Sequence, residues 1–137
     1  MKNLIDLFNR FCGGLVAPLA NLWARIYIGL IFFRSGRAKL EDFEETIEFF
    51  EDDWALPFLS AEPAAFLATA GELILPIMLF VGLFTRIGAV GLLIMTAVIQ
   101  FYVLPDHQHY LWMIALAMIA GYGGDKLSLD HLWLKSK

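Results

Sequence analysis

The ionisable residues that lie inside long apolar runs are the first candidates for chemistry in this chain. Glu72 is the single ionisable residue between Pro63 and Phe84, in the run PAAFLATAGELILPIMLFVGLF. A helix of that length is about 30 Å long, the thickness of a bilayer's hydrocarbon core. A carboxylate at that depth costs about 2.5–3.5 kcal/mol, so it normally faces a partner or a wet cavity. Glu72 is therefore either a structural hydrogen-bond partner between helices or a proton- or ligand-binding group.

Arg25 is the candidate partner of Glu72. It lies about 12–15 Å from the start of the first apolar helix, and Glu72 lies about 15 Å from the same side of the membrane on the second, at 1.5 Å per residue. Opposite charges at one depth on consecutive helices predict a buried ion pair, which would offset the cost of either charge alone. The pair would serve either to fix the helix register or as a catalytic, proton-handling pair.

A second polar group is expected beyond the first and third apolar runs. It comprises Arg34, Arg37, Lys39, Asp106, His107 and His109, with Tyr110 and Trp112 beside them. Three interpretations stay open. The first is ordinary anchoring at the membrane interface. The second is a site for a quinone head group, with Arg34, Lys39 and His107 as hydrogen-bond donors and Trp112 stacking.

The third interpretation is a divalent-metal or copper site formed by His107, His109 and an acidic residue of the outer loop. In an extended loop, two histidines spaced two residues apart point the same way. Gln100 lies late in the third apolar run, where an amide often bonds a neighbouring helix. It is expected to be structural, with a place in the quinone site as the alternative.

Composition places the chain in a membrane. Of its 137 residues, 59% are hydrophobic and only 18% are charged, against about a quarter in soluble domains. The net charge is −4, and no basic patch with interleaved aromatics is present, which argues against nucleic acid as a partner. Cys12 is the only cysteine, so an internal disulfide and a two-cysteine redox motif are excluded.

The apolar runs predict an all-α integral membrane four-helix bundle that forms one domain over residues 1–137. The expected spans are 15–33, 63–82, 87–104 and 107–124, with a re-entrant segment as the alternative for the last. Gly82 and Thr85 are the expected C-cap and N-cap of a tight hairpin between spans two and three. The tail after Asp125 is expected to form a short interfacial helix.

An acidic amphipathic helix is predicted over 40–56, between the first two spans. Its apolar positions recur at spacings of three and four, at Leu40, Phe43, Ile47, Phe50 and Trp54. The opposite face carries Glu44, Glu45, Glu48, Glu51 and Asp52. Such a helix lies in the interface, and its acidic face suggests that it covers the mouth of the bundle.

The distribution of Lys and Arg predicts the orientation. With the amino terminus inside, the inner segments hold Lys2, Arg10, Arg86, Lys126, Lys135 and Lys137, and the outer ones hold Arg34, Arg37 and Lys39. The excess of inner positive charge and the even number of spans predict that both termini are cytoplasmic.

Several short motifs together resemble the DoxX family of small bacterial membrane proteins. They are Arg25-x-x-x-Gly29, Ser35-Gly36-x-x-Lys39-Leu40, Glu72, Gly82-Leu83-Phe84-Thr85-Arg86, Gly123-Gly124 and Ser128-Leu129-Asp130, and they extend over about residues 22–132. The resemblance implies a four-helix bundle in the bacterial inner membrane. It also implies an association with thiosulfate:quinone oxidoreductase or other membrane oxidoreductases, and for some relatives with copper or metallophore handling.

Two functions are therefore expected. In one, the protein is a quinone-interacting subunit of a redox system; since the sequence has no haem, flavin or iron–sulfur motif, a partner oxidoreductase would supply the electrons. In the other, it is a non-enzymatic anchor or accessory for a periplasmic partner or for copper. The bilayer is a partner in both cases. Small residues in spans two and three also permit a homo-oligomer, which as a small transporter or channel would be a weaker third function.

Overall fold

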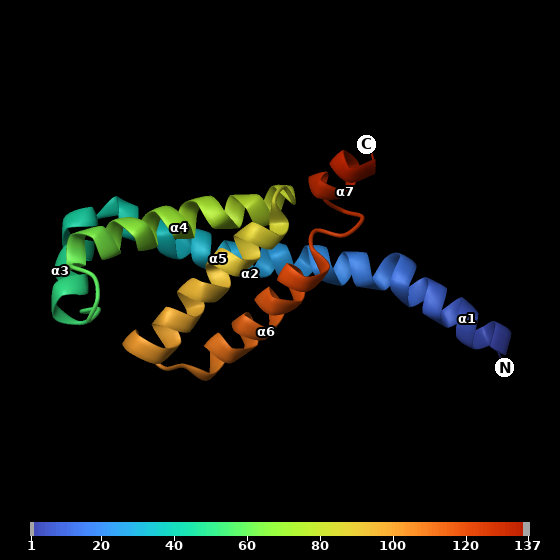
Figure 1. Ribbon diagram of the computed structural model, residues 1–137, viewed down its shortest axis with the longest axis horizontal. Helices are drawn as coiled ribbons and strands as arrows, with labels where there is room; N and C mark the ends of the chain where they lie inside the picture. The colour runs from blue at the N-terminus through green and yellow to red at the C-terminus, as the bar shows by residue number, and fades with distance from the viewer. Residues whose placement is uncertain (1, 136–137) are drawn as a thin grey trace.

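The structure is a computed structural model that describes residues 2–135, and they form helices joined by short connections (Figure 1). The elements in order are α1 (Lys2–Phe11), the π-helical turn η1 (Cys12–Val16), α2 (Ala17–Glu41), α3 (Phe43–Asp52), α4 (Ala61–Val81), α5 (Thr85–Val98), the π-helical turn η2 (Ile99–Val103), α6 (His107–Tyr122) and α7 (Leu129–Lys135). Among the described residues the only β-type pairing is an isolated bridge between Leu56 and Leu59. The all-α prediction is confirmed.

Helices α2, α4, α5 and α6 form the bundle. In Figure 1, α2 and α4 run side by side, and the α5–α6 hairpin lies against them at an angle. The apolar core is shared among all four helices and includes Ile28, Phe32, Leu79, Leu92, Leu116 and Ile119. Among residues 2–135, three helical stretches are long and apolar enough to cross a membrane: Lys2–Glu41, Ala61–Val81 and Thr85–Val103. At 16 residues, α6 is about 24 Å long and falls short of a full hydrocarbon core.

The helices match the expected ranges closely at the second, third and fourth spans, and differ at the first. There, α1, η1 and α2 form one continuous helix of 40 residues from Lys2 to Glu41. Pro18, which lacks an N–H, sits where the π-helical turn gives way to α2 and so does not interrupt the helix. Arg34 and Lys39 consequently lie on the last turns of α2 and not in a loop.

Helix α3 covers one end of the α2–α4 pair, hereafter the α3 end. Asp42 begins it as N-cap, with its carboxylate accepting a hydrogen bond from the Glu45 N–H at 3.1 Å. Phe50 packs against Ala64 and Ala65 of α4. The acidic face is exposed, as the sequence predicts. Leu40 was expected on the apolar face of this helix, but it belongs to α2 and is 59% exposed.

At the opposite end, hereafter the hairpin end, α7 holds the turn between α4 and α5. Gly82 ends α4 with a φ of 70°, as a C-cap requires. The expected N-cap at Thr85 is wrong: Phe84 is the N-cap, and the Asp130 carboxylate accepts from the N–H groups of Phe84 and Thr85 at 2.8 and 2.9 Å. The Asp130 N–H in turn donates to the Gly82 carbonyl at 2.8 Å. The cap therefore comes from 45 residues away, which local sequence patterns do not reveal.

Asp130→Asn is expected to lower the stability of the hairpin end. Burial raises the pKa of Asp130, but the hydrogen bonds from Thr85 and Phe84 and the charge of Arg25 outweigh it, so its pKa lies below the usual range. Stabilisation by the carboxylate is thus present above the unfolded pKa of about 3.9 and is lost as pH falls through the lower folded-state value. We expect a loss of about 1–3 kcal/mol at neutral pH, measured by reversible unfolding in mixed micelles. Asp53→Asn, at an exposed site on the far end, is the control, and equal effects of the two variants would refute this role.

Candidate functional site

Glu72 lies at a point where α2 and α4 approach unusually closely. Gly36 of α2 faces it, and a Cβ at Gly36 would lie 2.8 Å from the Glu72 Cβ and 3.0 Å from its backbone carbon. A larger residue would push the two helices apart. Glycine at this position therefore brings the Glu72 side chain within reach of the residues that flank Gly36 along α2.

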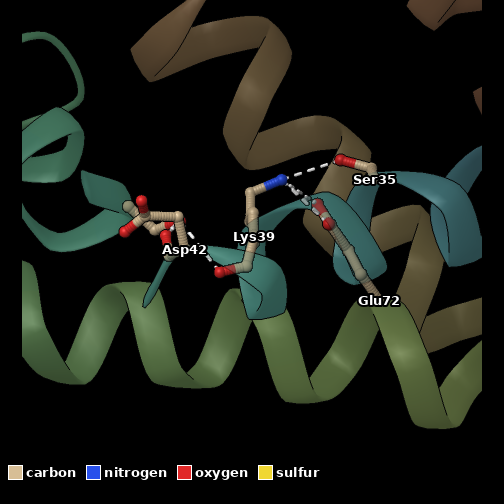
Figure 2. A network of polar contacts seen from close by, with 5 residues as sticks. Ser35, Lys39, Asp42 and Glu72 are labelled. Carbon is tan, nitrogen blue, oxygen red and sulfur yellow. Dashed lines mark hydrogen bonds and ion pairs between the residues drawn. The ribbon is translucent and has the colours of Figure 1, made fainter. Parts of the chain in front are cut away.

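Lys39 is the partner of Glu72. Its Nζ donates to both carboxylate oxygens, at 2.8 and 3.1 Å, and to the Ser35 Oγ at 2.7 Å (Figure 2). Ser35 and Lys39 are four residues apart and therefore lie on one face of α2. The side chain of Glu72 is 3% exposed and that of Lys39 is 14% exposed, so the ion pair is nearly dry. Both charges are satisfied by each other, as a buried pair requires.

Two cavities adjoin this ion pair. The first, of about 190 Å³, has Glu72 as its one charged residue; the rest of its wall is apolar and comes from Phe50, Trp54, Leu56, Phe58, Leu59, Ala64, Leu67, Ala68, Ile94, Met95, Val98, Ile99 and Val103. The second, of about 280 Å³ and hereafter the polar cavity, is lined by Ser35, Lys39, Asp42, Glu45 and Thr46 together with the apolar residues Ala38, Phe49 and Trp54. Trp54 lines both, and Lys39 Nζ lies 5.8 Å from the centroid of its ring. The pair is thus positioned between an apolar pocket and a polar one.

This arrangement can bind and exchange a proton. A carboxylate in the wall of an apolar pocket is a hydrogen-bond acceptor for a ligand hydroxyl, whereas the three N–H groups of the neighbouring ammonium already donate to Glu72 and Ser35. The polar cavity beside Lys39 offers further acceptors along a route toward the α3 end.

The predicted ion pair between Arg25 and Glu72 is wrong. Arg25 is fully buried at the hairpin end, where its Nη1 donates to the Leu79 carbonyl at 3.2 Å and its Nη2 to the Leu127 carbonyl. Fourteen residues separate Arg25 from Lys39 on α2, or about 21 Å. Arg25 ties α4 and the segment before α7 to α2, and it takes no part in the Glu72 site.

Gln100, His109 and Trp112 form a separate group near the junction of α5 and α6. The Gln100 Oε1 accepts from the Asp106 N–H at 2.9 Å and lies 3.0 Å from His109 Nδ1. Because this oxygen is an acceptor, Nδ1 carries the proton. The His109 ring lies 5.1 Å from that of Trp112, which contacts Phe32 of the core. Gln100 thus bonds a neighbouring helix as expected, and no hydrogen bond or ion pair among residues 2–135 links this group to Glu72.

The remaining predicted site residues are not brought together. His107 is exposed and His109 is buried, because α6 begins at His107 and successive helical positions turn by about 100°. The expectation that the two histidines point the same way is therefore wrong. Within residues 2–135 no group of three or more His, Cys, Asp or Glu residues could hold a metal ion. Arg34 is exposed on α2.

Ser35 and Trp54 are the members of the site that sequence reasoning missed. The spacing of Ser35 and Lys39 was a usable signal, since residues four apart share a helix face. Trp54 was assigned to the apolar face of the acidic helix. In the structure α3 ends at Asp52, and Trp54 lies in the connection that follows. The centroid of its ring lies 5.4 Å from that of the Phe50 ring.

A family model described as DoxX matches residues 20–105, which is more than half of the chain. The chain belongs to the DoxX family. The matched region contains Ser35, Gly36, Lys39 and Glu72, and it ends before α6 and α7. No significant match is found among curated proteins or among solved structures. Family membership and the apolar helices together make this a membrane protein.

Lys39→Ala is expected to destabilise the protein strongly, because it leaves the Glu72 carboxylate buried without a partner. We expect a loss of about 3–5 kcal/mol in reversible unfolding. The double substitution Lys39→Met with Glu72→Leu should recover most of this loss, since it removes both charges and keeps their volume. Arg37→Ala, which breaks an exposed pair with Glu41, is the matched control and should cost little. A double variant no more stable than Lys39→Ala would contradict this account.

Double-mutant cycles should show which of the two cations, Lys39 or Arg25, interacts with Glu72. Lys39 and Glu72 are in contact, so the effects of Lys39→Ala and Glu72→Gln on the free energy of unfolding should be non-additive by about 0.5–3 kcal/mol. Arg25→Ala and Glu72→Gln share no partner, and their effects should add within about 0.5 kcal/mol. Strong coupling in the second cycle would instead support the Arg25–Glu72 ion pair that the sequence predicts.

Proposed function

We propose that this protein is the membrane subunit of a redox system and binds a quinone at the Lys39–Glu72 site. The observation that carries this proposal is a buried carboxylate, Glu72, in the wall of an apolar pocket, held there by its ion pair with Lys39. Apolar walls with a few convergent polar groups are the usual form of a small-molecule site. A quinone combines an apolar ring and tail with two polar oxygens, which suits such walls.

The size of the apolar cavity fits a head group better than a whole ligand. Its volume of about 190 Å³ is below the range of about 300–1,000 Å³ for pockets that enclose a drug-sized molecule. We infer that the ring enters the cavity and that the isoprenoid tail stays in the bilayer. Exposed apolar residues of the cavity wall, Phe58, Leu67 and Ile94, offer a path for the tail.

Each residue of the site then has a stated role. Glu72, which lines the apolar cavity, accepts the proton of a hydroquinone hydroxyl, and Lys39 holds the Glu72 carboxylate in place. Oxidation of hydroquinone releases two protons and two electrons; a partner oxidoreductase in the membrane or periplasm would take the electrons, and quinone reduction is the reverse. Ser35 holds Lys39 in place. Arg25, which the sequence offers as a catalytic partner of Glu72, is a structural residue in this proposal.

The membrane placement belongs to the same proposal. Membership of the DoxX family favours the bacterial inner membrane, and the Lys and Arg distribution favours both termini in the cytoplasm. The hairpin end would then face the cytoplasm and the α3 end the periplasm. The polar cavity beside Lys39 would exchange protons with the periplasmic side.

Binding of a short-tailed quinone tests the proposal directly. Decylubiquinone should bind the wild-type protein in nanodiscs with micromolar affinity by titration calorimetry. Glu72→Gln should weaken binding at least tenfold, and Ala68→Phe should abolish it by filling the apolar cavity. Glu62→Gln, on the exposed first turn of α4, is the matched control and should bind normally. A folded wild-type protein that binds neither decylubiquinone nor a menaquinone analogue at 100 μM (about −5.5 kcal/mol) would refute the proposal.

The exposed acidic face of α3 favours a second function. Glu44, Glu48, Glu51 and Asp52 are exposed, and no protein cation neutralises them among the hydrogen bonds and ion pairs of the described residues. Such a surface suits a non-enzymatic accessory that docks a basic periplasmic protein. Glu44→Gln, Glu48→Gln and Glu51→Gln combined should then abolish cross-linking to that partner in native membranes and leave decylubiquinone binding intact. Unchanged cross-linking would exclude this face.

A further inference from the structure

Helix α1 is strongly amphipathic, and none of the described residues buries its apolar face. Every residue from Lys2 to Phe11 is exposed. At 100° per residue its large apolar side chains share one face, and they are Leu4 (72% exposed), Ile5, Leu7, Phe8 and Phe11. The other face carries Lys2, Asn3, Asp6, Asn9 and Arg10. An apolar face of this size is unstable in water and implies a covering partner.

The length of the first helix excludes a straight path through the bilayer. The continuous helix from Lys2 to Glu41 has 40 residues and is about 60 Å long, twice the hydrocarbon core. Its contacts with the bundle begin near Asn21 and Arg25, at the hairpin end. Figure 1 shows α1 extending beyond that end, on the side where α7 lies. The helix therefore leaves the hydrocarbon region before it reaches α1.

The joint between α1 and α2 is suited to a bend. It is the π-helical turn Cys12–Val16, and π-turns and glycines are common sites of helix kinks. Gly13 and Gly14 lie within it, and a Cβ at either would meet no atom within 4 Å. Within residues 2–135, no neighbouring atom therefore requires glycine at these positions.

We propose that α1 bends at Gly13–Gly14 and lies flat in the membrane interface at the hairpin end, with its apolar face in the acyl boundary. The partner is the lipid surface. An in-plane helix has this strong amphipathicity with cations on the polar face, here Lys2 and Arg10. Other apolar groups at the same end, Leu83, Phe84, Leu129 and Leu132, are also exposed, which indicates that this end of the fold meets lipid. The DoxX match begins at residue 20, so α1 is outside the matched region.

Spin-label accessibility in the full-length protein tests this placement. Single cysteines at positions 3 to 11 are introduced in a Cys12→Ser background, labelled, and reconstituted in liposomes of phosphatidylethanolamine and phosphatidylglycerol. Labels at positions 4, 5, 8 and 11 should be severalfold more accessible to oxygen than to a water-soluble nickel chelate, and labels at 3, 6, 9 and 10 should show the reverse. A label at Ile94 gives the lipid reference and one at Glu48 the aqueous reference.

Two results would overturn the proposal. Uniform accessibility to the nickel chelate would mean that α1 stands in water. Dipolar broadening between labels that disappears on dilution with unlabelled protein would mean that a second copy covers the face. As a further test, Leu4→Glu with Phe8→Glu should make the label at position 11 aqueous, whereas the matched change Asn3→Glu with Asn9→Glu should not. Identical behaviour of these two variants would equally contradict an interfacial helix.

Discussion

The buried ion pair between Lys39 and Glu72 is the interaction on which the site depends. It requires close approach of α2 and α4, which Gly36 permits, and exclusion of water, which α3 and Trp54 provide. Neither charge is tolerable at that depth alone, so each fixes the position of the other. The acidic helix α3 therefore has a structural function as well as an exposed surface: it closes the end of the bundle over the pair.

A second polar junction holds the other end of the same two helices. Arg25 bonds backbone carbonyls of α4 and of the segment before α7, and Asp130 caps α5 across the Gly82 turn. These bonds are mostly to backbone groups, and Asp130 also lines a cavity of about 470 Å³ at this end. The two junctions differ in what they hold: the hairpin end fixes the chain path, and the α3 end places a buried carboxylate in an apolar wall.

Much of the fold follows from the sequence because lipid imposes simple rules. Backbone groups in a bilayer must be paired internally, so long apolar runs with turn residues between them predict helices and their approximate ends. The hydrogen bond of the Gln100 amide to a neighbouring helix was predictable because a polar group in lipid also needs a partner. The acidic face of α3 was predictable from the spacing of its apolar residues. The extent of the first helix was not, because polar residues such as Arg34 and Lys39 continue a helix as readily as apolar ones and the chain has no strong stop signal before Asp42.

By itself, the sequence determined that Glu72 is a lone acid within apolar surroundings, that the protein is helical and membrane-bound, and that its motifs resemble those of DoxX proteins. Only the tertiary structure decided which cation meets that acid. Counting residues from the helix ends places Glu72 level with Arg25. In the structure, however, α2 extends past the hairpin end. The close approach of Gly29 to Phe80 and of Gly36 to Glu72 gives α2 and α4 a different register. Register between antiparallel helices depends on where small residues admit a neighbour, and this is a property of the two surfaces together.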